Sequence, residues 1–207
     1  MRSAVFTALL FAAGVTAAGS DACAEPPLEI QLAHGSASEL ETKKQLERLL
    51  AQYDLSPWRF TSKIAIDDDA IPHSHPILTL HTRHLRDDDL LLSTYIHEQS
   101  HWYFSNHAAQ TAQAVVALKQ LFPGLPIGFP DGGDTLDSSY EHLMVIAFER
   151  DGVIRLLGEL RAHAILQFWA DDHYRALYRL MLDTTRRKPV WDVMKKVQLL
   201  PPAGAKK

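Results

Sequence analysis

The sequence predicts an α+β fold that is mainly helical, with a small sheet beside a central helix. Three observations favour this fold. Apolar residues recur at helical spacing through most of the chain after residue 88. Segments rich in β-branched and aromatic residues occur before that point, within residues 59–83. A composition of 46% hydrophobic and 22% charged residues over 207 residues is ordinary for one globular domain with its own core.

The N-terminus has the pattern of a secretory signal peptide. Met1-Arg2 is followed by an apolar stretch at residues 4–18 and then by Ala22-Cys23-Ala24, which matches an A-x-A cleavage signal. The apolar stretch is shorter than a membrane span, so we expect no stable membrane insertion. We expect residues 1–24 to be removed and the protein to be periplasmic or secreted. Lipoprotein anchoring through Cys23 is the alternative, but the Leu-rich segment that precedes a lipidated cysteine is missing.

Charge and cysteine content argue against a nucleic-acid-binding protein and against a disulfide-stabilised protein. The net charge of -4, with no basic face in the sequence, argues against a nucleic-acid partner. Cys23 is the only cysteine, so the chain after the signal peptide can form no internal disulfide. Its stability must therefore come from a packed core.

The first part of the mature chain predicts a leader and then a helix. Residues 25–37 contain Pro and Gly and predict a loosely attached leader, which places the domain at residues 38–200. Ser38 and Glu41 have the spacing of a capping box, so Ser38 is the expected N-cap of a helix that ends near residue 53. The tail at residues 201–207 is expected to be disordered.

Two strands are predicted before the central helix, at residues 59–66 and 77–83. Between them, Asp67-Asp68-Asp69 predicts a solvated turn, because a calcium loop needs further oxygen ligands at regular spacing. His73 and His75 lie in a loop bounded by prolines, where exposed histidines are expected rather than metal ligands.

The central helix carries the pattern His-Glu-x-x-His (HExxH) and is expected to begin near Asp88 and to run past His107. On a helix, His97 and His101 lie one turn apart on the same face, so both imidazoles can bind one metal ion. Glu98 is rotated away from that face by one residue. From there it can reach a water molecule held on the metal, which is the position of a general base.

This motif resembles that of the zincin superfamily of zinc-dependent metallopeptidases. Together with Ser139-Tyr140-Glu141-His142-Leu143, it is also similar to a group of uncharacterised bacterial zincin-like proteins. The resemblance implies one Zn²⁺ and hydrolysis of a peptide or other amide, with Glu98 as the general base. It also implies that an extended substrate adds to an edge strand, for which residues 77–83 are the candidate.

A catalytic zinc takes three protein ligands and leaves one position for water, so His97 and His101 need a third partner. His142 is the predicted ligand. It lies on a strongly apolar helix that is expected to start at Ser138 or Ser139 and to run toward Leu157. Glu149 lies two turns further along the same face, where it is expected to support His142 as an outer carboxylate.

Three other residues compete for the third position. His107 falls where the longer pattern H-E-x-x-H-x-x-G-x-x-H has its last histidine, but Phe104 occupies the position at which that pattern needs a glycine. Glu141 and Glu149 are the other two, since in the gluzincin branch of the superfamily a Glu of a downstream helix completes the site.

The remaining segments supply further expectations. The irregular stretch of residues 123–137 joins the two ligand-bearing helices and predicts a wall or lid of the active site. Tyr140 and Tyr103 are candidates for stabilising an oxyanion. Shorter helices are expected at residues 158–168, from 171 or 172 to 185, and 190–199.

A non-catalytic metal-binding or interaction protein with the same fold is the alternative to a hydrolase. Glu98 argues against it, because a structural zinc site has four protein ligands and no use for an adjacent carboxylate.

Overall fold

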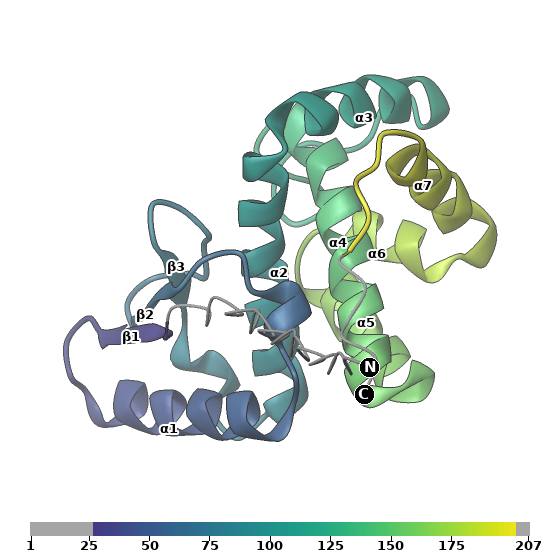
Figure 1. The fold of residues 1–207 in the computed structure, drawn as a ribbon. Helices are drawn as coiled ribbons and strands as arrows, with labels where there is room; N and C mark the ends of the chain where they lie inside the picture. Colours follow the sequence, from purple (N-terminus) through teal and green to yellow (C-terminus); the bar gives the residue numbers. More distant parts are fainter. Residues whose placement is uncertain (1–26, 202–207) are drawn as a thin grey trace, which may run out of the picture.

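The fold is given by a computed structural model that describes residues 27–201. The predicted signal peptide and the tail from residue 202 lie outside these residues. As predicted, the described part is mainly helical with one small sheet (Figure 1). No helix among residues 27–201 combines the length and the apolar character of a membrane span. The elements are β1 (Glu29–Leu32), α1 (Ala37–Gln52), β2 (Lys63–Ile66), β3 (Leu78–Leu80), α2 (Asp88–Asn106), α3 (Ala108–Leu121), α4 (Leu136–Leu157), α5 (Glu159–Asp172), α6 (Arg175–Leu182) and α7 (Thr184–Lys196), with 3₁₀ turns at Ser56–Trp58 and Thr82–His84.

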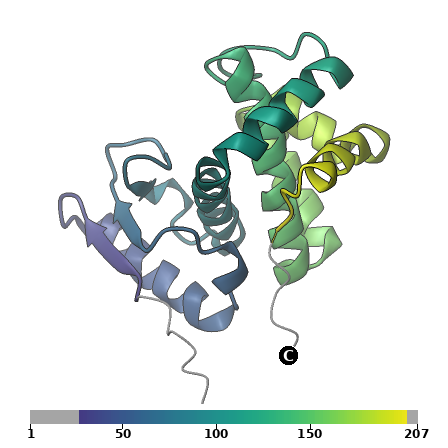
Figure 2. The same ribbon diagram turned by 45° about the horizontal axis from the view of Figure 1, so that its top comes forward.

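Helix α2 lies at the centre of the molecule. The sheet and α1 lie on one side of it, and α4 to α7 lie on the other (Figures 1 and 2). The sheet is parallel, with the order β1-β2-β3, and Ile30 and Leu78 flank Ile64. Because α2 packs against both layers, every residue from Leu90 to Ser100 is buried. Polar groups of the HExxH motif are therefore held in the interior, where each needs a partner.

The predicted leader is wrong, because residues 29–32 form β1 and pair with β2. Their alternation of polar and apolar residues is itself a strand signal. The cap prediction is also wrong by two positions: Ser36 is the N-cap of α1, and Glu39 completes the capping box. Glu39 is fully buried and accepts the backbone N–H groups of His34, Gly35 and Asp68, which ties the start of α1 to the segment after β2.

Both later strands are shorter than predicted. The backbone N–H groups of Phe60 and Thr61 donate to Gln99 Oε1 on α2, at 2.7 and 2.9 Å, so β2 begins only at Lys63. The predicted strand of residues 77–83 narrows to β3, and a 3₁₀ turn follows it. On the side of β3 away from β2, Thr79 exchanges both backbone hydrogen bonds with His73, at 2.7 and 3.1 Å.

The helices after residue 107 differ from prediction mainly at their ends. Helix α2 ends at Asn106 instead of running past His107 as predicted, and α4 begins earlier, with Thr135 rather than Ser138 or Ser139 as its N-cap. Helix α5 continues to Asp172, and the predicted helix from there to residue 185 is interrupted. Tyr174 adopts a left-handed backbone conformation (φ 49°, ψ 33°) between α5 and α6. Such a conformation at a non-glycine residue is uncommon and often marks a functional position.

Helices α2 and α4 approach closely at Gly152. A Cβ atom at this position would lie 3.1 Å from side-chain atoms of Ile96 and Trp58. We therefore expect Gly152→Val to lower the free energy of unfolding by about 1–3 kcal/mol, the usual effect of overpacking a core. Urea denaturation followed by circular dichroism measures it. Ala109→Val at an exposed site of α3 controls for helix propensity, and equal losses in both variants would contradict close packing at Gly152.

Candidate metal centre

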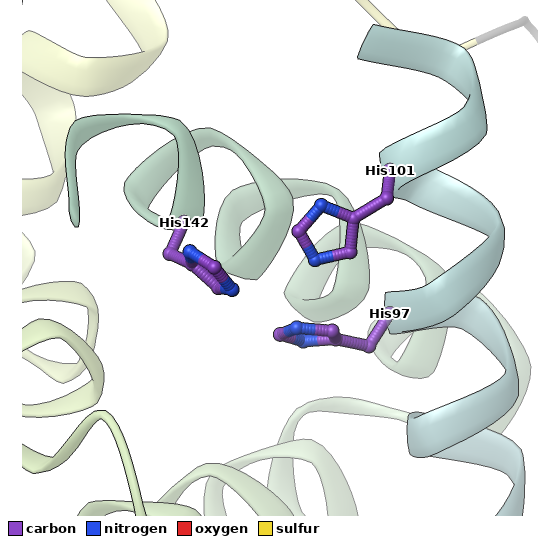
Figure 3. A group of neighbouring side chains, drawn as sticks. All are labelled: His97, His101 and His142. Carbon is purple, nitrogen blue, oxygen red and sulfur yellow. The ribbon is translucent and has the colours of Figure 1, made fainter. Parts of the chain in front are cut away.

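Three histidines converge in the interior of the protein. His97 and His101 lie one turn apart on α2, and His142 faces them from α4 (Figure 3). One ring nitrogen of each lies within 4.8 Å of those of the other two, a spacing that could accommodate a metal ion. His97 and His142 are buried, and His101 is half-buried. The structure therefore places the predicted third partner, His142, beside the histidine pair.

The Nδ1 atom of each imidazole faces a protein oxygen. His97 Nδ1 lies 2.9 Å from Glu149 Oε2, and His142 Nδ1 lies 2.7 Å from the carbonyl oxygen of Ser138. His101 Nδ1 lies 3.5 Å from Glu141 Oε1. When Nδ1–H donates to such an acceptor, Nε2 keeps its lone pair for a metal. All three Nε2 atoms are thus available as ligands.

Burial keeps two of these imidazoles neutral. The pKa values of His97 and His142 are held well below the ordinary value, first by burial and then by the charge of His101. A histidine must be neutral to bind a metal, because protonation removes the lone pair. The site is therefore ready for a cation at neutral pH without losing protons from His97 or His142.

Glu149 supports His97, which corrects the prediction that it supports His142. It is fully buried on α4, and its carboxylate accepts hydrogen bonds from the hydroxyls of Ser93 and of Tyr178, the latter at 2.7 Å. Trp169 Nε1–H in turn donates to Ser93 Oγ at 2.9 Å. The expectation failed because spacing along α4 does not show which residue of α2 faces Glu149. Burial raises the pKa of Glu149 to about 7.

The other candidates for the third position lie outside the group. Glu141 is behind His101, on its Nδ1 side. His107 is the C-cap of α2, and its Nδ1 lies 2.8 Å from the carbonyl oxygen of Tyr103. Phe104 remains helical and fully buried, so the chain does not turn where the longer histidine pattern requires it. Glu149, as described, contacts a histidine and is not a member of the group.

Glu98 lines the same cavity as the three histidines. Its side chain is buried, and burial raises its pKa to about 7, although the charges of His101 and His73 oppose the shift. A carboxylate with a pKa near neutrality can both accept and return a proton at physiological pH, which is the requirement for a general base that later acts as an acid. The structure therefore places Glu98 in the same cavity as the three histidines, with a pKa suited to proton transfer.

The cavity has a volume of about 510 Å³, within the range of small-ligand sites. The loop predicted as a wall or lid contributes Phe129, Gly132 and Asp134 to its lining. This loop is anchored at two points along its course: Ser139 Oγ donates to the carbonyl of Pro126 at 2.6 Å, and the Arg175 N–H donates to that of Pro130 at 3.0 Å. Because these hydrogen bonds hold the loop in place, it forms a fixed wall of the cavity.

The prediction that Tyr140 or Tyr103 stabilises an oxyanion is wrong. Tyr140 donates its hydroxyl to the carbonyl of Phe122 and Tyr103 donates to that of Leu200, and neither lines the cavity. Tyr174 lines it instead, with its ring centroid 4.1 Å from that of His142. Burial, with the nearby charges of Glu98 and Asp134, raises the pKa of Tyr174 to about 12. In the sequence Tyr174 reads only as one more apolar position of a helix.

A second group of potential ligands lies beside the sheet and does not line this cavity. It consists of His34, Glu39, Asp67 and Asp68. The carboxylate of Asp68 accepts hydrogen bonds from the hydroxyls of Ser36 and Ser38 at 2.6 and 2.9 Å, and that of Asp67 accepts backbone N–H groups of the following turn. Through these hydrogen bonds the acidic residues form a network that joins the start of α1 to the turn after β2. The predicted turn is present, and it is part of this network.

No family model, no curated protein and no solved structure matches this chain. The chemistry of the site is therefore inferred from its own residues.

Proposed function

We propose that this protein is a zincin-like zinc hydrolase that cleaves amide bonds, most simply as a metallopeptidase. One observation carries the proposal: three imidazoles whose Nδ1 atoms face protein oxygens share a cavity with a buried carboxylate of raised pKa. Three protein ligands with an open position form the ligand set of a catalytic zinc, whereas structural zinc sites have four. Neutral nitrogen ligands also suit zinc better than calcium or magnesium, which take oxygen ligands.

His97, His101 and His142 would hold the metal through Nε2. A bound Zn²⁺ would act as a Lewis acid that lowers the pKa of a bound water and polarises the scissile carbonyl. Glu98 would accept the proton of that water and deliver it to the leaving nitrogen. Tyr174 replaces Tyr140 and Tyr103 as the candidate donor to the developing oxyanion, because its raised pKa keeps the hydroxyl protonated at neutral pH.

The expected mode of substrate binding needs one change. Addition of an extended peptide along residues 77–83 is obstructed at Thr79, where His73 already occupies both backbone groups. Residues 71–74, which include His73, contribute to the lining of the cavity. We infer that an extended substrate would lie along residues 71–74 rather than along β3 itself.

Metal removal tests the proposal. The purified protein should contain zinc by mass spectrometry and should hydrolyse members of a quenched fluorescent peptide library. Treatment with 1,10-phenanthroline should abolish hydrolysis, and added Zn²⁺ should restore it, because Glu98 has no metal-bound water to act on in the apoprotein. A zinc-loaded protein that cleaves no peptide or other amide would instead support the non-catalytic alternative.

Glu149→Gln should weaken zinc binding by about 10–100-fold, the usual effect of removing an outer-shell partner of a metal-bound histidine. The glutamine keeps the size of the side chain but no longer gives His97 Nδ1–H a charged acceptor. Competition with a chromophoric chelator measures the affinity. Glu159→Gln is the matched control, because Glu159 is exposed and pairs with Arg150 on the surface. Unchanged affinity in Glu149→Gln would show that His97 does not need this acceptor.

A further inference from the structure

Two strongly exposed apolar side chains line the cavity of the three histidines. Ile71 is 82% exposed and Phe129 is 83% exposed, and both line the cavity together with Pro72. Among residues 27–201, the only large apolar side chain more exposed than these is Leu160, at 86%, and it does not line the cavity. We call Ile71, Pro72 and Phe129 the apolar rim. Exposed apolar groups gathered at a concave site generally mark a binding surface.

Hydrogen bonds hold both parts of the apolar rim in place. Phe129 lies in a tight loop in which the Gly128 N–H donates to the carbonyl of Gly133 at 2.7 Å and the Gly132 N–H donates to that of Gly128 at 2.9 Å. Phe129 is therefore presented to solvent by a hydrogen-bonded turn. A rigid apolar group loses little entropy on binding, which favours a role in recognition.

The segment that carries Ile71 is anchored to α2 and to β3. His73 pairs with Thr79 through the backbone, and Trp102 Nε1–H on α2 donates to the carbonyl of Ser74 at 2.7 Å. The ring of His75 stacks on that of Trp102, with centroids 4.3 Å apart. The apolar rim is thus built from two separate loops. One is fixed to the HExxH helix, and the other is fixed to α4 and α6.

The charge around the apolar rim identifies the kind of partner. Residues 64–82 and 120–135 contain no lysine or arginine, and the arginine that lines the cavity, Arg83, is paired with Asp172 at 2.8 Å. Asp69 and Asp134, both exposed, lie close to the two apolar tips along the chain. Proteins that lie on anionic membranes combine apolar groups with basic ones, so this surface is unsuited to a lipid headgroup layer. A neutral or basic polypeptide with a bulky apolar side chain fits both properties.

We propose that the apolar rim is a substrate subsite that takes the bulky apolar side chain of a polypeptide whose neighbouring amide enters the metal centre. This inference rests on the proposed function in one respect: the bound polypeptide is a substrate only if the protein is a hydrolase. Binding of the apolar side chain at the rim does not depend on hydrolysis. Preference for apolar over acidic side chains follows from the rim residues and from the carboxylates beside them.

Equilibrium binding tests the subsite without turnover. The probes are fluorescein-labelled glycine-alanine peptides with one central residue, Leu, Phe, Ser or Asp, and the protein is the zinc-loaded Glu98→Gln variant. Fluorescence anisotropy should show the Leu and Phe peptides binding about tenfold more tightly than the Ser peptide, as expected for partial burial of one such side chain. The Asp peptide should bind most weakly.

Single substitutions in this background assign the preference to the apolar rim. Phe129→Ser and Ile71→Ser should each weaken the binding of the Leu and Phe peptides about tenfold. The affinity for the Ser peptide should be unchanged, because only the apolar contact is lost. Leu160→Ser, at an equally exposed site outside the cavity, should change none of the affinities. All three positions are on the surface, so thermal unfolding curves should coincide with that of the parent variant.

Several outcomes would overturn the subsite. These are equal affinities for all four peptides, no measurable binding of the Leu and Phe peptides, and an effect of Leu160→Ser as large as that of Phe129→Ser. Rim-dependent binding to phosphatidylcholine–phosphatidylserine vesicles, or rim-dependent self-association in sedimentation, without any peptide preference, would assign the surface to a membrane or to a second copy. Peptide preference in Glu98→Gln without hydrolysis by the unmodified protein would contradict the proposed hydrolase and leave the subsite intact.

Discussion

Glu98→Gln should lower kcat/KM for peptide hydrolysis by about 10²–10⁴-fold, the range attributed to a positioned general base. The amide cannot accept the proton of a metal-bound water, whereas the glutamate can. Glutamine has nearly the same size, and Glu98 is buried in the cavity without belonging to the group of three histidines that could hold the metal. Zinc content should therefore remain at the level of the unmodified protein.

Steady-state kinetics on the best peptide of the library, together with metal analysis of the same samples, measures this result. Glu41→Gln, on the surface of α1, is the matched control because it makes the same chemical change far from the cavity. Full activity in Glu98→Gln would refute the role of Glu98 as base. Loss of zinc along with activity would show instead that the carboxylate is needed to keep the metal.

His142→Ala should weaken zinc binding by more than the roughly 100-fold that loss of an outer-shell partner produces, because it removes one of the three histidine nitrogens grouped at the proposed zinc site. Two histidines on one helix would remain, and a catalytic site needs three protein ligands. Activity should fall with the bound metal.

Thermal unfolding offers a second measurement of the same change. A ligand that binds only the folded state raises its stability according to its concentration and affinity. Added Zn²⁺ should raise the unfolding temperature of the unmodified protein but not that of His142→Ala. His107→Ala should behave like the unmodified protein, since His107 lies outside the group. The opposite pattern, with His107 needed and His142 dispensable, would overturn the ligand assignment.

Much of the central helix could be predicted because its signals are local. Asp87 caps α2 and two acidic residues occupy its first turn, which agrees with a helix predicted to begin near Asp88. The spacing of His97 and His101 places both rings on one face of any helix. These features depend on residues a few positions apart, so no knowledge of the rest of the fold is needed.

The errors at the N-terminal side arose where tertiary contacts replaced local rules. Phe60 and Thr61 have strand-like composition, yet their N–H groups bond to the side chain of Gln99. The capping box forms with Glu39 rather than Glu41 because Glu39 also bonds to Asp68, well separated in the chain. Local patterns contain no information about such partners.

Local patterns in the sequence were enough to predict an HExxH helix with two potential ligands and a carboxylate beside them. They also predicted a downstream apolar helix that carries His142 and Glu149. The packing of the helices was needed to show that His142 faces the pair, that Glu149 supports His97, and that Tyr174 and the apolar rim line the cavity. The physical reason is that helical periodicity sets which face a residue occupies, whereas the packing of α2 against α4 and α6 sets what that face meets.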